Sequence, residues 1–292
     1  MTIDLDGARD WVVQGDNAAV LPGLPAASFQ MIYIDPPFNT GRTQTRRTLA
    51  TARDDAGDRV GFKGRTYATT VTGSRAYGDT FDDYLAFLEP KLHEARRLLT
   101  ESGTFYLHLD YREVHYAKVM LDRIFGRACF LNEIIWAYDY GARATRKWPA
   151  KHDTILVYVK NPAEYWFDAS AVDREPYMAP GLVTKEKAER GKLPTDVWWH
   201  TIVSPTGKEK TGYPTQKPEG VLRRMIAAST RPGDRVLDFF AGSGTTGAAA
   251  RALGRRFVLI DSHPEAVAVM RARLGTKDVA FRTLTARGSR AG

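Results

Sequence analysis

The chain has 292 residues, of which 43% are hydrophobic and 26% charged, which suits one α/β domain with a substantial core. Its net charge of +8 favours a polyanionic partner. No apolar run approaches membrane-spanning length, and the first residues lack the basic and apolar regions of a signal peptide. The single cysteine, Cys129, excludes an internal disulfide and a metal site built from cysteines. We therefore expect no membrane partner, no metal and a reducing cytoplasm.

The first predicted strand covers residues 11–14 and leads into Gly15, Asp16 and Asn17. Apolar residues at helical spacing follow directly. On this pattern alone, Asp16 is expected to cap that short helix.

A second apolar run, residues 31–34, predicts a buried parallel strand. Pro36 and Pro37 end it abruptly, because neither can donate to a β ladder. Asp35 and Phe38 are therefore held on a stiff turn at the carboxyl end of a strand, where α/β sheets bind ligands. This predicts a clamp for a flat molecule with an amino group, although an isolated turn of this kind is also an ordinary corner.

Residues 42–79 form a long polar segment with little periodicity. It carries eight basic residues: Arg42, Arg46, Arg47, Arg53, Arg59, Lys63, Arg65 and Arg75. An irregular segment of this length is either a mobile solvated loop or a functional one that orders on its partner.

Amphipathic helices are predicted from 81 to 99 and from 110 to 126, with strands at 104–109, 132–138 and 152–159. His108 and Asp110 lie at a strand's carboxyl end, where they could line a pocket, although Asp110 also suits a helix cap. Basic and aromatic residues interleave at 140–148, as expected where phosphates and an unstacked base are held.

Residues 162–212 are the least regular part, with Trp166, Tyr177, Trp198 and Trp199 among many lysines. We expect a small subdomain in which the aromatic residues form a local core.

Residues 236–247 predict a strand, a glycine-rich turn and a helix start. This is neither a P-loop nor a full G-x-G-x-x-G fingerprint. The next strand, 257–260, ends in Asp261, a position that commonly accepts hydrogen bonds from ribose hydroxyls. The unit therefore predicts a nucleoside-like cofactor that needs no phosphate.

Three motifs now stand together: D-P-P-F-N-T-G at 35–41, Y-P-T-Q-K-P at 213–218 and D-F-F-A-G-S-G-T-T at 238–246. They resemble the S-adenosylmethionine-dependent amino methyltransferases of DNA bases, and the resemblance covers nearly the whole chain apart from a central stretch. The catalytic motif precedes the cofactor motif, as in the permuted beta class. The resemblance implies a Rossmann-like α/β fold with about seven mainly parallel strands.

The resemblance also implies a division of the chain. Residues 1–161 would be the catalytic half, with 42–79 as a DNA-contacting loop, and 213–292 the cofactor-binding half. Residues 162–212 would be the target-recognition region, and the 140–148 hairpin would lie near the flipped base.

The implied catalytic residues are Asp35, Pro36, Pro37 and Phe38. The implied cofactor-binding residues are Asp16, Asn17, Asn39, Thr215, Lys217, Asp238, Phe239, Phe240, Gly242, Ser243, Gly244, Thr245, Thr246 and Asp261. Asp16 would contact the adenine amino group of the cofactor. Thr215 and Lys217 would contact its carboxylate, although Lys217 could equally neutralise a phosphate.

In the expected mechanism, Asp35 and the Pro36 carbonyl accept the hydrogens of an exocyclic base nitrogen, whose lone pair then attacks the methyl sulfonium directly. Phe38 would stack on a base that has left the duplex. Cys129 is not preceded by proline, which argues against a cytosine C5 methyltransferase.

Asp35 favours adenine N6 over cytosine N4, in line with most family members. An RNA or protein amide methyltransferase and a non-catalytic DNA-binding subunit are less favoured alternatives. The expected partner is duplex DNA at the nucleoid. A homodimer is also possible, and the enzyme could act either with a cognate restriction endonuclease or in an orphan regulatory role.

Overall fold

The computed structural model describes residues 3, 5, 7, 9–39, 42–53, 59–60, 66–79, 81, 83–139, 143–204 and 207–284, without side chains in 42–79. By its internal contacts the chain divides into two compact units. Unit 1 comprises Met1–Pro36 with Leu85–Gly292, and unit 2 comprises Pro37–Tyr84.

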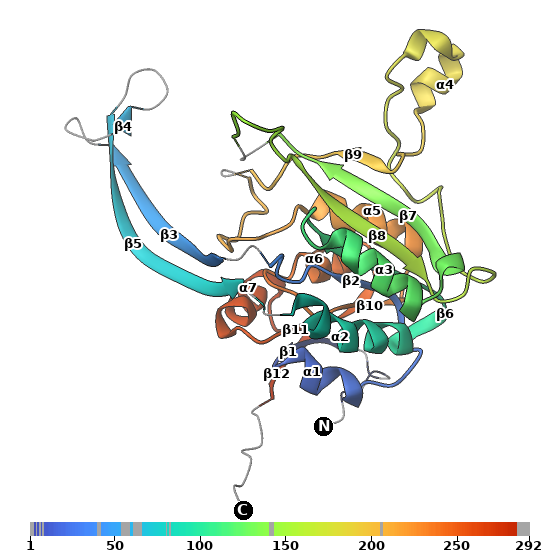
Figure 1. The fold of residues 1–292 in the computed structure, drawn as a ribbon, viewed down its shortest axis with the longest axis horizontal. Helices are drawn as coiled ribbons and strands as arrows, with labels where there is room; N and C mark the ends of the chain where they lie inside the picture. Colours follow the sequence, from blue (N-terminus) through green and yellow to red (C-terminus); the bar gives the residue numbers. More distant parts are fainter. Residues whose placement is uncertain are drawn as a thin grey trace, which may run out of the picture. The chain divides into compact units, whose positions relative to one another are not determined.

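Unit 1 is built on a nine-stranded sheet in the order β12-β1-β11-β10-β2-β6-β8-β7-β9 (Figure 1). Every strand pair is parallel except those of β8, which is antiparallel to both β6 and β7. The strands are β1 (Asp10–Gln14), β2 (Phe29–Ile34), β6 (Leu99–Leu109), β7 (Phe130–Ala137), β8 (His152–Val159), β9 (Val197–Trp199), β10 (Arg235–Asp238), β11 (Arg256–Asp261) and β12 (Val279–Thr283).

The mainly parallel sheet confirms the predicted fold class, with nine strands in place of about seven. All six residues of β2 are buried, as a strand covered on both faces requires. Strand β9 was not predicted from the sequence, because its three residues are too few to show a period.

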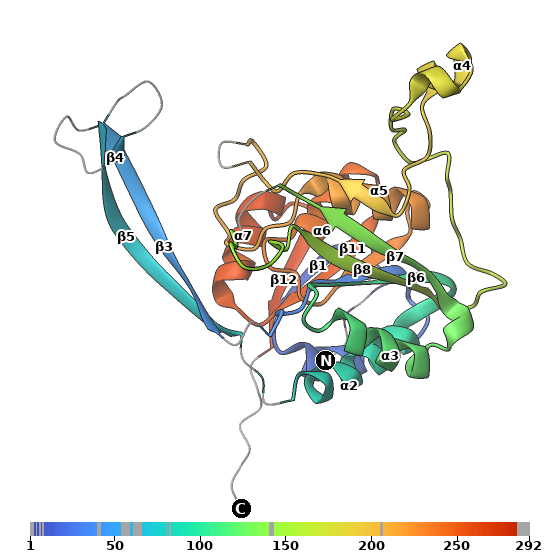
Figure 2. The same cartoon turned by 45° about the horizontal axis from the view of Figure 1, so that its top comes forward.

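Helices cover both faces of this sheet. Figure 2 shows α2 (Tyr84–Leu98) and α3 (Val114–Ile124) on one face, and α5 (Glu219–Ser229), α6 (Thr245–Ala252) and α7 (Pro264–Leu274) on the other. The short α1 (Asn17–Val20) and η1 (Leu21–Gly23) follow β1, and η3 (Arg127–Cys129) precedes β7. No helix in the described part of the chain combines the length and apolarity needed to cross a membrane.

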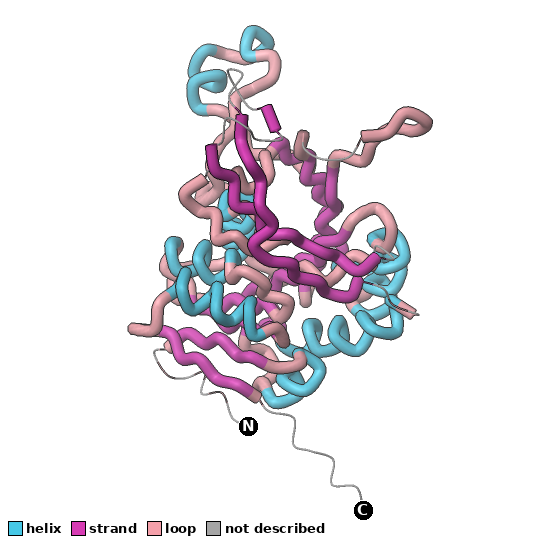
Figure 3. Tube along the Cα trace, turned by 90° about the vertical axis from the view of Figure 1, so that its left-hand side faces the viewer, coloured by secondary structure: helices cyan, strands magenta, loops and turns pink. Residues whose placement is uncertain are grey.

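The segment between β8 and β9 belongs to unit 1. It carries η4 (Pro180–Leu182) and α4 (Lys185–Arg190), which project from the sheet in Figures 1 and 3. An antiparallel bridge joins Glu175 to Lys192, the residues on either side of these two helices in the chain. Trp198 is buried in the main core of unit 1, whereas Trp199 is exposed. Trp198 thus joins the main core and not the separate local core that was expected, because β9 joins the main sheet. The recognition role of this segment stays a prediction.

Unit 2 contains a three-stranded antiparallel sheet: β3 (Arg42–Arg53), β5 (Thr66–Asp79) and β4 (Arg59–Val60). The expectation of an irregular segment at 42–79 is therefore wrong. β3 and β5 pair from Arg42 opposite Asp79 to Arg53 opposite Tyr67. Threonine-rich sequence with valine and tyrosine suits strands, and its many polar residues leave out the apolar alternation that usually marks one. Lys63 and Arg65 lie outside the described residues.

Candidate active site

The motifs that begin at Asp35 and Asp238 meet at the topological switch point of the sheet, where the order of the strands reverses. From β10 the chain passes through α6 to β11 on one side, and from β2 it passes through α2 to β6 on the other. β10 and β2 are direct neighbours, with Val236 opposite Met31 and Leu237 opposite Ile32. Asp238 and Asp35 end these strands at the same edge. Such a switch point is the usual ligand site of an open α/β sheet.

The glycine-rich turn after β10 has a backbone that side chains would disturb. Gly242 and Gly244 have φ values of +50° and +73°. A Cβ on Gly244 would lie 2.7 Å from Cγ of Met270, and one on Gly242 would lie 3.2 Å from Cε1 of Tyr213. These glycines leave the turn compact, with α6 beginning directly after it at Thr245.

The Asp238 carboxylate stabilises this turn through two hydrogen bonds. Its Oδ1 accepts a hydrogen bond from the Phe240 backbone N–H (3.0 Å), and its Oδ2 accepts one from the Thr246 hydroxyl (2.6 Å). Burial raises the pKa of Asp238 to about 7 although both hydrogen bonds oppose the shift, and the charges of Asp35 and Asp261 raise it further. Asp238 is thus a structural acceptor with a labile proton near neutral pH.

Asp261 joins the end of β11 to the same turn. Its Oδ2 accepts from the Gly242 N–H (2.8 Å) and its Oδ1 from the His263 N–H (2.9 Å). Burial raises the pKa of Asp261, against these two hydrogen bonds. Its backbone carbonyl accepts from the Gly15 N–H (2.9 Å), which brings the element at 15–17 to this edge.

The element at 15–17 is also tied to the turn by a side chain. The buried Asn17 amide donates to the Phe239 carbonyl (2.9 Å). Asp16 is exposed and caps α1 by accepting from the Ala18 N–H (2.9 Å), which confirms the helix-capping prediction. The structure therefore gathers three predicted cofactor segments, the first of which lies more than 200 residues before the other two in the chain.

Asp35 forms an ion pair through its Oδ2 with the Lys217 ammonium group. The two side chains are only 15% and 13% exposed. The second oxygen, Oδ1, is buried and has no hydrogen-bond partner among the described residues. Pro36 is buried, and Thr215, the other residue predicted to contact the cofactor carboxylate, is exposed.

Pro37, Phe38 and Asn39 belong to unit 2, so the catalytic motif spans the passage from one unit to the other. All three are partly buried. Within unit 2, the Asn39 carboxamide oxygen accepts from the Phe81 N–H (3.1 Å), and Asn39 has a φ of +53°, a conformation that asparagine tolerates. Thr40 and Gly41 of the motif lie outside the described residues.

A buried polar network behind Asp35 has no signal in the sequence. The Tyr33 hydroxyl lies 2.8 Å from His108 Nδ1, and His108 Nε2 lies 3.2 Å from Asp153 Oδ2. The Tyr138 hydroxyl donates to Asp153 Oδ1 (3.0 Å). Burial would raise the pKa of Asp153, but the interactions with His108 and the charge of Lys217 lower it overall. Tyr33 and Asp153 thus contact the two ring nitrogens of His108 from opposite sides of the imidazole.

His108 is completely buried, so it contacts this network and not a pocket surface. Asp110 pairs with Arg112, and α3 begins only at Val114, with Glu113 as its cap. Asp110 Oδ1 also accepts from the Arg112 backbone N–H (2.9 Å), which is the hydrogen bond expected of a cap, although the turn at 111–113 separates Asp110 from the first residue of α3.

Arg273 of α7 is a further residue that the sequence did not indicate. It donates to the Thr245 hydroxyl (3.0 Å) and the Ser243 carbonyl (3.3 Å), and pairs with Glu219 (2.6 Å). It therefore clamps the start of α6 to the start of α5. No local motif marks such a residue, because its role depends on helix packing.

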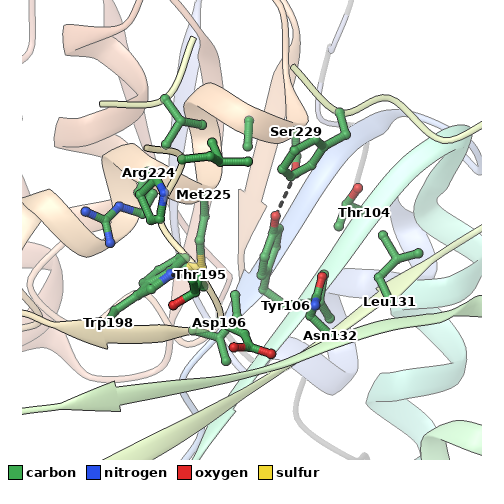
Figure 4. A pocket seen from close by; sticks show the side chains of 17 residues that line it. Thr104, Tyr106, Leu131, Asn132, Thr195, Asp196, Trp198, Arg224, Met225 and Ser229 are labelled. Atoms are coloured by element: carbon green, nitrogen blue, oxygen red, sulfur yellow. Dashed lines mark hydrogen bonds between the residues drawn. The ribbon is translucent and has the colours of Figure 1, made fainter. Parts of the chain in front are cut away.

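A cavity of about 400 Å³ lies away from this edge, between α5, β6, β7 and the segment before β9 (Figure 4). Its walls include Leu131, Met225 and Trp198, and the Tyr106 and Ser229 hydroxyls lie 2.6 Å apart at its margin. The Thr104 hydroxyl at its wall is buried without a hydrogen-bond partner among the described residues.

Comparison with known proteins agrees with this geometry. The model of a family described as DNA methylase matches residues 29–272. The chain belongs to this DNA methylase family. A relative from Escherichia coli K12, the DNA adenine methyltransferase YhdJ, is 31% identical over 262 residues, covering 87% of this chain and 79% of the relative.

Two solved structures of methylases share the fold. The complex of M1.HpyAVI with SAM aligns with a TM-score of 0.57 and 21% identity over 91% of this chain and 99% of that chain. PvuII DNA methyltransferase, which is cytosine-N4-specific, aligns with a TM-score of 0.62 and 16% identity over 93% of this chain and 88% of that chain. These matches confirm the predicted methyltransferase fold.

Proposed function

We propose that this methylase transfers a methyl group from S-adenosylmethionine to the N6 nitrogen of adenine in duplex DNA. The observation that carries the proposal is Asp35, whose buried and unpartnered Oδ1 lies at the switch point beside the glycine-rich turn. A buried acceptor without a donor is costly in a folded protein, which suits an atom that receives its hydrogen from a substrate. The adenine methyltransferase among the relatives supports the choice of base.

The residues at the switch point fit S-adenosylmethionine. The compact glycine turn and the start of α6 present backbone at close range, and the carboxylates of Asp35, Asp238 and Asp261 suit a ligand with a positive sulfonium. When bound, this cofactor supplies an electrophilic methyl group. We assign its binding to Asp16, Asn17, Asn39, Thr215, Asp238, Phe239, Phe240, Gly242, Ser243, Gly244, Thr245, Thr246 and Asp261. Lys217 was predicted to join them, but its ammonium group pairs with Asp35.

In the proposed mechanism, Asp35 Oδ1 and the Pro36 carbonyl accept the two hydrogens of the adenine amino group. This arrangement localises the nitrogen lone pair, which is otherwise delocalised into the ring. Pro37 keeps the turn rigid and Phe38 stacks on the flipped base. Catalysis then rests on positioning and electrostatics without a covalent intermediate.

The surface near the carboxyl ends of β7 and β9 suits the DNA. β7 runs parallel to β9 and in the same direction as β6, so both end at the edge that carries Asp35. Exposed Arg146, Lys147 and Trp148 follow β7, and Trp199, 77% exposed, ends β9. Cations and aromatic rings of this kind bind phosphates and unstacked bases. Residues 140–142 of the predicted hairpin lie outside the described residues.

The proposal includes the functional division of the chain at residues 161 and 212 and a DNA-contacting role for residues 42–79. It also places the enzyme in the cytoplasm, at the nucleoid. A homodimer and a cognate endonuclease stay predictions.

The test is transfer of labelled methyl from S-adenosylmethionine to genomic DNA, followed by nucleoside mass spectrometry. We expect N6-methyladenine with the wild-type enzyme, at least 1,000-fold less with Asp35→Ala, and S-adenosylmethionine affinity in that variant within about threefold of the wild type. N4-methylcytosine would keep the mechanism and change the base. Methyl groups on RNA or protein alone would refute DNA as the substrate.

A further inference from the structure

We propose that Lys217 is a positioning residue for Asp35: it holds Oδ2 of the carboxylate so that Oδ1 remains aimed at the target amino group. This inference rests on the proposed function and deepens it. It differs from the prediction that Lys217 contacts the carboxylate of the cofactor, and the two roles have different kinetic consequences.

The first step of the argument concerns the freedom of the Asp35 side chain. The terminal torsion of an aspartate is broad, so the backbone and Pro36 alone do not determine where each oxygen points. The Lys217 ammonium binds Oδ2, and both side chains are largely buried. One oxygen is thereby held, and the other is left as the unpartnered acceptor.

The second step concerns what holds Lys217. Its backbone carbonyl accepts from the Thr245 hydroxyl (3.1 Å) at the start of α6. The following residue is the buried Pro218, which restricts Lys217 to an extended backbone. Arg273 donates to the same Thr245 hydroxyl (3.0 Å) and to Glu219 (2.6 Å) at the start of α5. Lys217 is therefore anchored at its backbone, and its side chain transmits that position to Asp35.

The third step concerns charge. Three carboxylates, Asp35, Asp153 and Asp238, surround the buried end of β2, since each of them raises the pKa of Tyr33 in addition to its burial. The positive charge of Lys217 is near enough to lower the pKa of Asp153 as well. A single buried cation thus offsets neighbouring carboxylates that would otherwise repel one another and displace Asp35.

The structure also connects the two substrates of the reaction. The path Arg273–Thr245–Lys217–Asp35 runs from the glycine-rich turn to the catalytic carboxylate. A cofactor seated on the turn would therefore reinforce the position of the acceptor without contacting the lysine side chain.

The experiment measures single-turnover methylation at saturating S-adenosylmethionine and DNA for Lys217→Met, Lys217→Arg and the wild type. We expect Lys217→Met to lose on the order of 100-fold in rate, as for a misplaced catalytic group. Calorimetric affinity for S-adenosylmethionine should change by less than about threefold. Lys217→Arg, which keeps the cation, should recover to within about tenfold of the wild type.

The matched control is Lys118→Met, which removes another partly buried lysine–aspartate pair, Lys118 with Asp122 (2.7 Å), on α3. Its rate should stay within about twofold of the wild type. Circular dichroism melting of each variant separates lost folding from lost catalysis, and Lys217→Gln replaces the methionine variant if that one does not fold. In an Asp35→Asn background, Lys217→Met should lower the residual rate by less than about threefold.

If Lys217→Met keeps the full rate at saturating substrates but binds S-adenosylmethionine at least tenfold more weakly, the inference is overturned and Lys217 is assigned to the cofactor. Equal losses in the wild-type and Asp35→Asn backgrounds would also overturn it, because they indicate a general structural role. If the wild-type enzyme transfers no methyl to DNA, the proposed function fails and the inference with it. If the wild-type enzyme methylates DNA and Lys217→Met does so at the same rate, the inference fails while the proposed function stands.

Discussion

The Asp238→Asn substitution should flatten the pH dependence of stability. Asp238 has a native pKa of about 7, whereas an aspartate in an unfolded chain has a pKa of about 3.9. Between these values the native state binds more protons than the unfolded state, so this group loses its stabilising contribution as pH rises. At pH 5, which is about two pH units below this native pKa, the raised pKa corresponds to about 3 kcal/mol of stability, and this contribution is gone by pH 8.

Asparagine retains both hydrogen bonds of Asp238. Its carboxamide oxygen can accept from the Phe240 N–H, and its amide nitrogen can donate to the Thr246 hydroxyl. The variant therefore removes the titration without removing the packing.

The assay is urea unfolding at pH 5, 6, 7 and 8, followed by tryptophan fluorescence. Other groups titrate in both proteins, so the quantity of interest is the difference between the variant and the wild type. We expect the free energy of unfolding of the variant, relative to the wild type, to rise by about 3 kcal/mol from pH 5 to pH 8. A difference that does not change with pH would refute a raised pKa for Asp238.

Two further substitutions, Thr104→Val and Gly244→Ala, test the cavity wall and the glycine-rich turn, and each has a control variant. Thr104→Val removes a buried, unpartnered hydroxyl and should raise the free energy of unfolding by about 1 kcal/mol; Thr230→Val, which removes a hydroxyl bonded to Ile226 and Arg255, should lower it. A loss in both variants would show that Thr104 has a partner such as water. Gly244→Ala forces a Cβ against Met270 at positive φ, so it should lower the melting temperature by several degrees and weaken S-adenosylmethionine binding. Its control, Gly254→Ala, has the same φ strain but open space around the Cβ, so it should affect only stability. Equal cofactor affinity in both variants would contradict the proposed role of the turn.

Local sequence was sufficient for the elements whose causes are local. The buried run of β2, its termination by two prolines and the glycine turn before α6 each depend on a few neighbouring residues. Motif order then indicated a permuted methyltransferase, and the sheet confirms that family fold. Residues 42–79 were misjudged because their sequence is polar and shows no apolar alternation, although its segments pair as β3 and β5.

The partnerships within the site came only from the tertiary structure. Lys217 and Asp35 are 182 residues apart, and Tyr33, His108 and Asp153 lie on three strands. Periodicity and propensity act over one or two turns of chain and cannot specify which side chains meet across a sheet. The physical reason is that these contacts follow from strand order: β2 and β10 become neighbours only when the whole sheet has formed, and that places the predicted catalytic carboxylate, Asp35, beside the turn predicted to bind the cofactor.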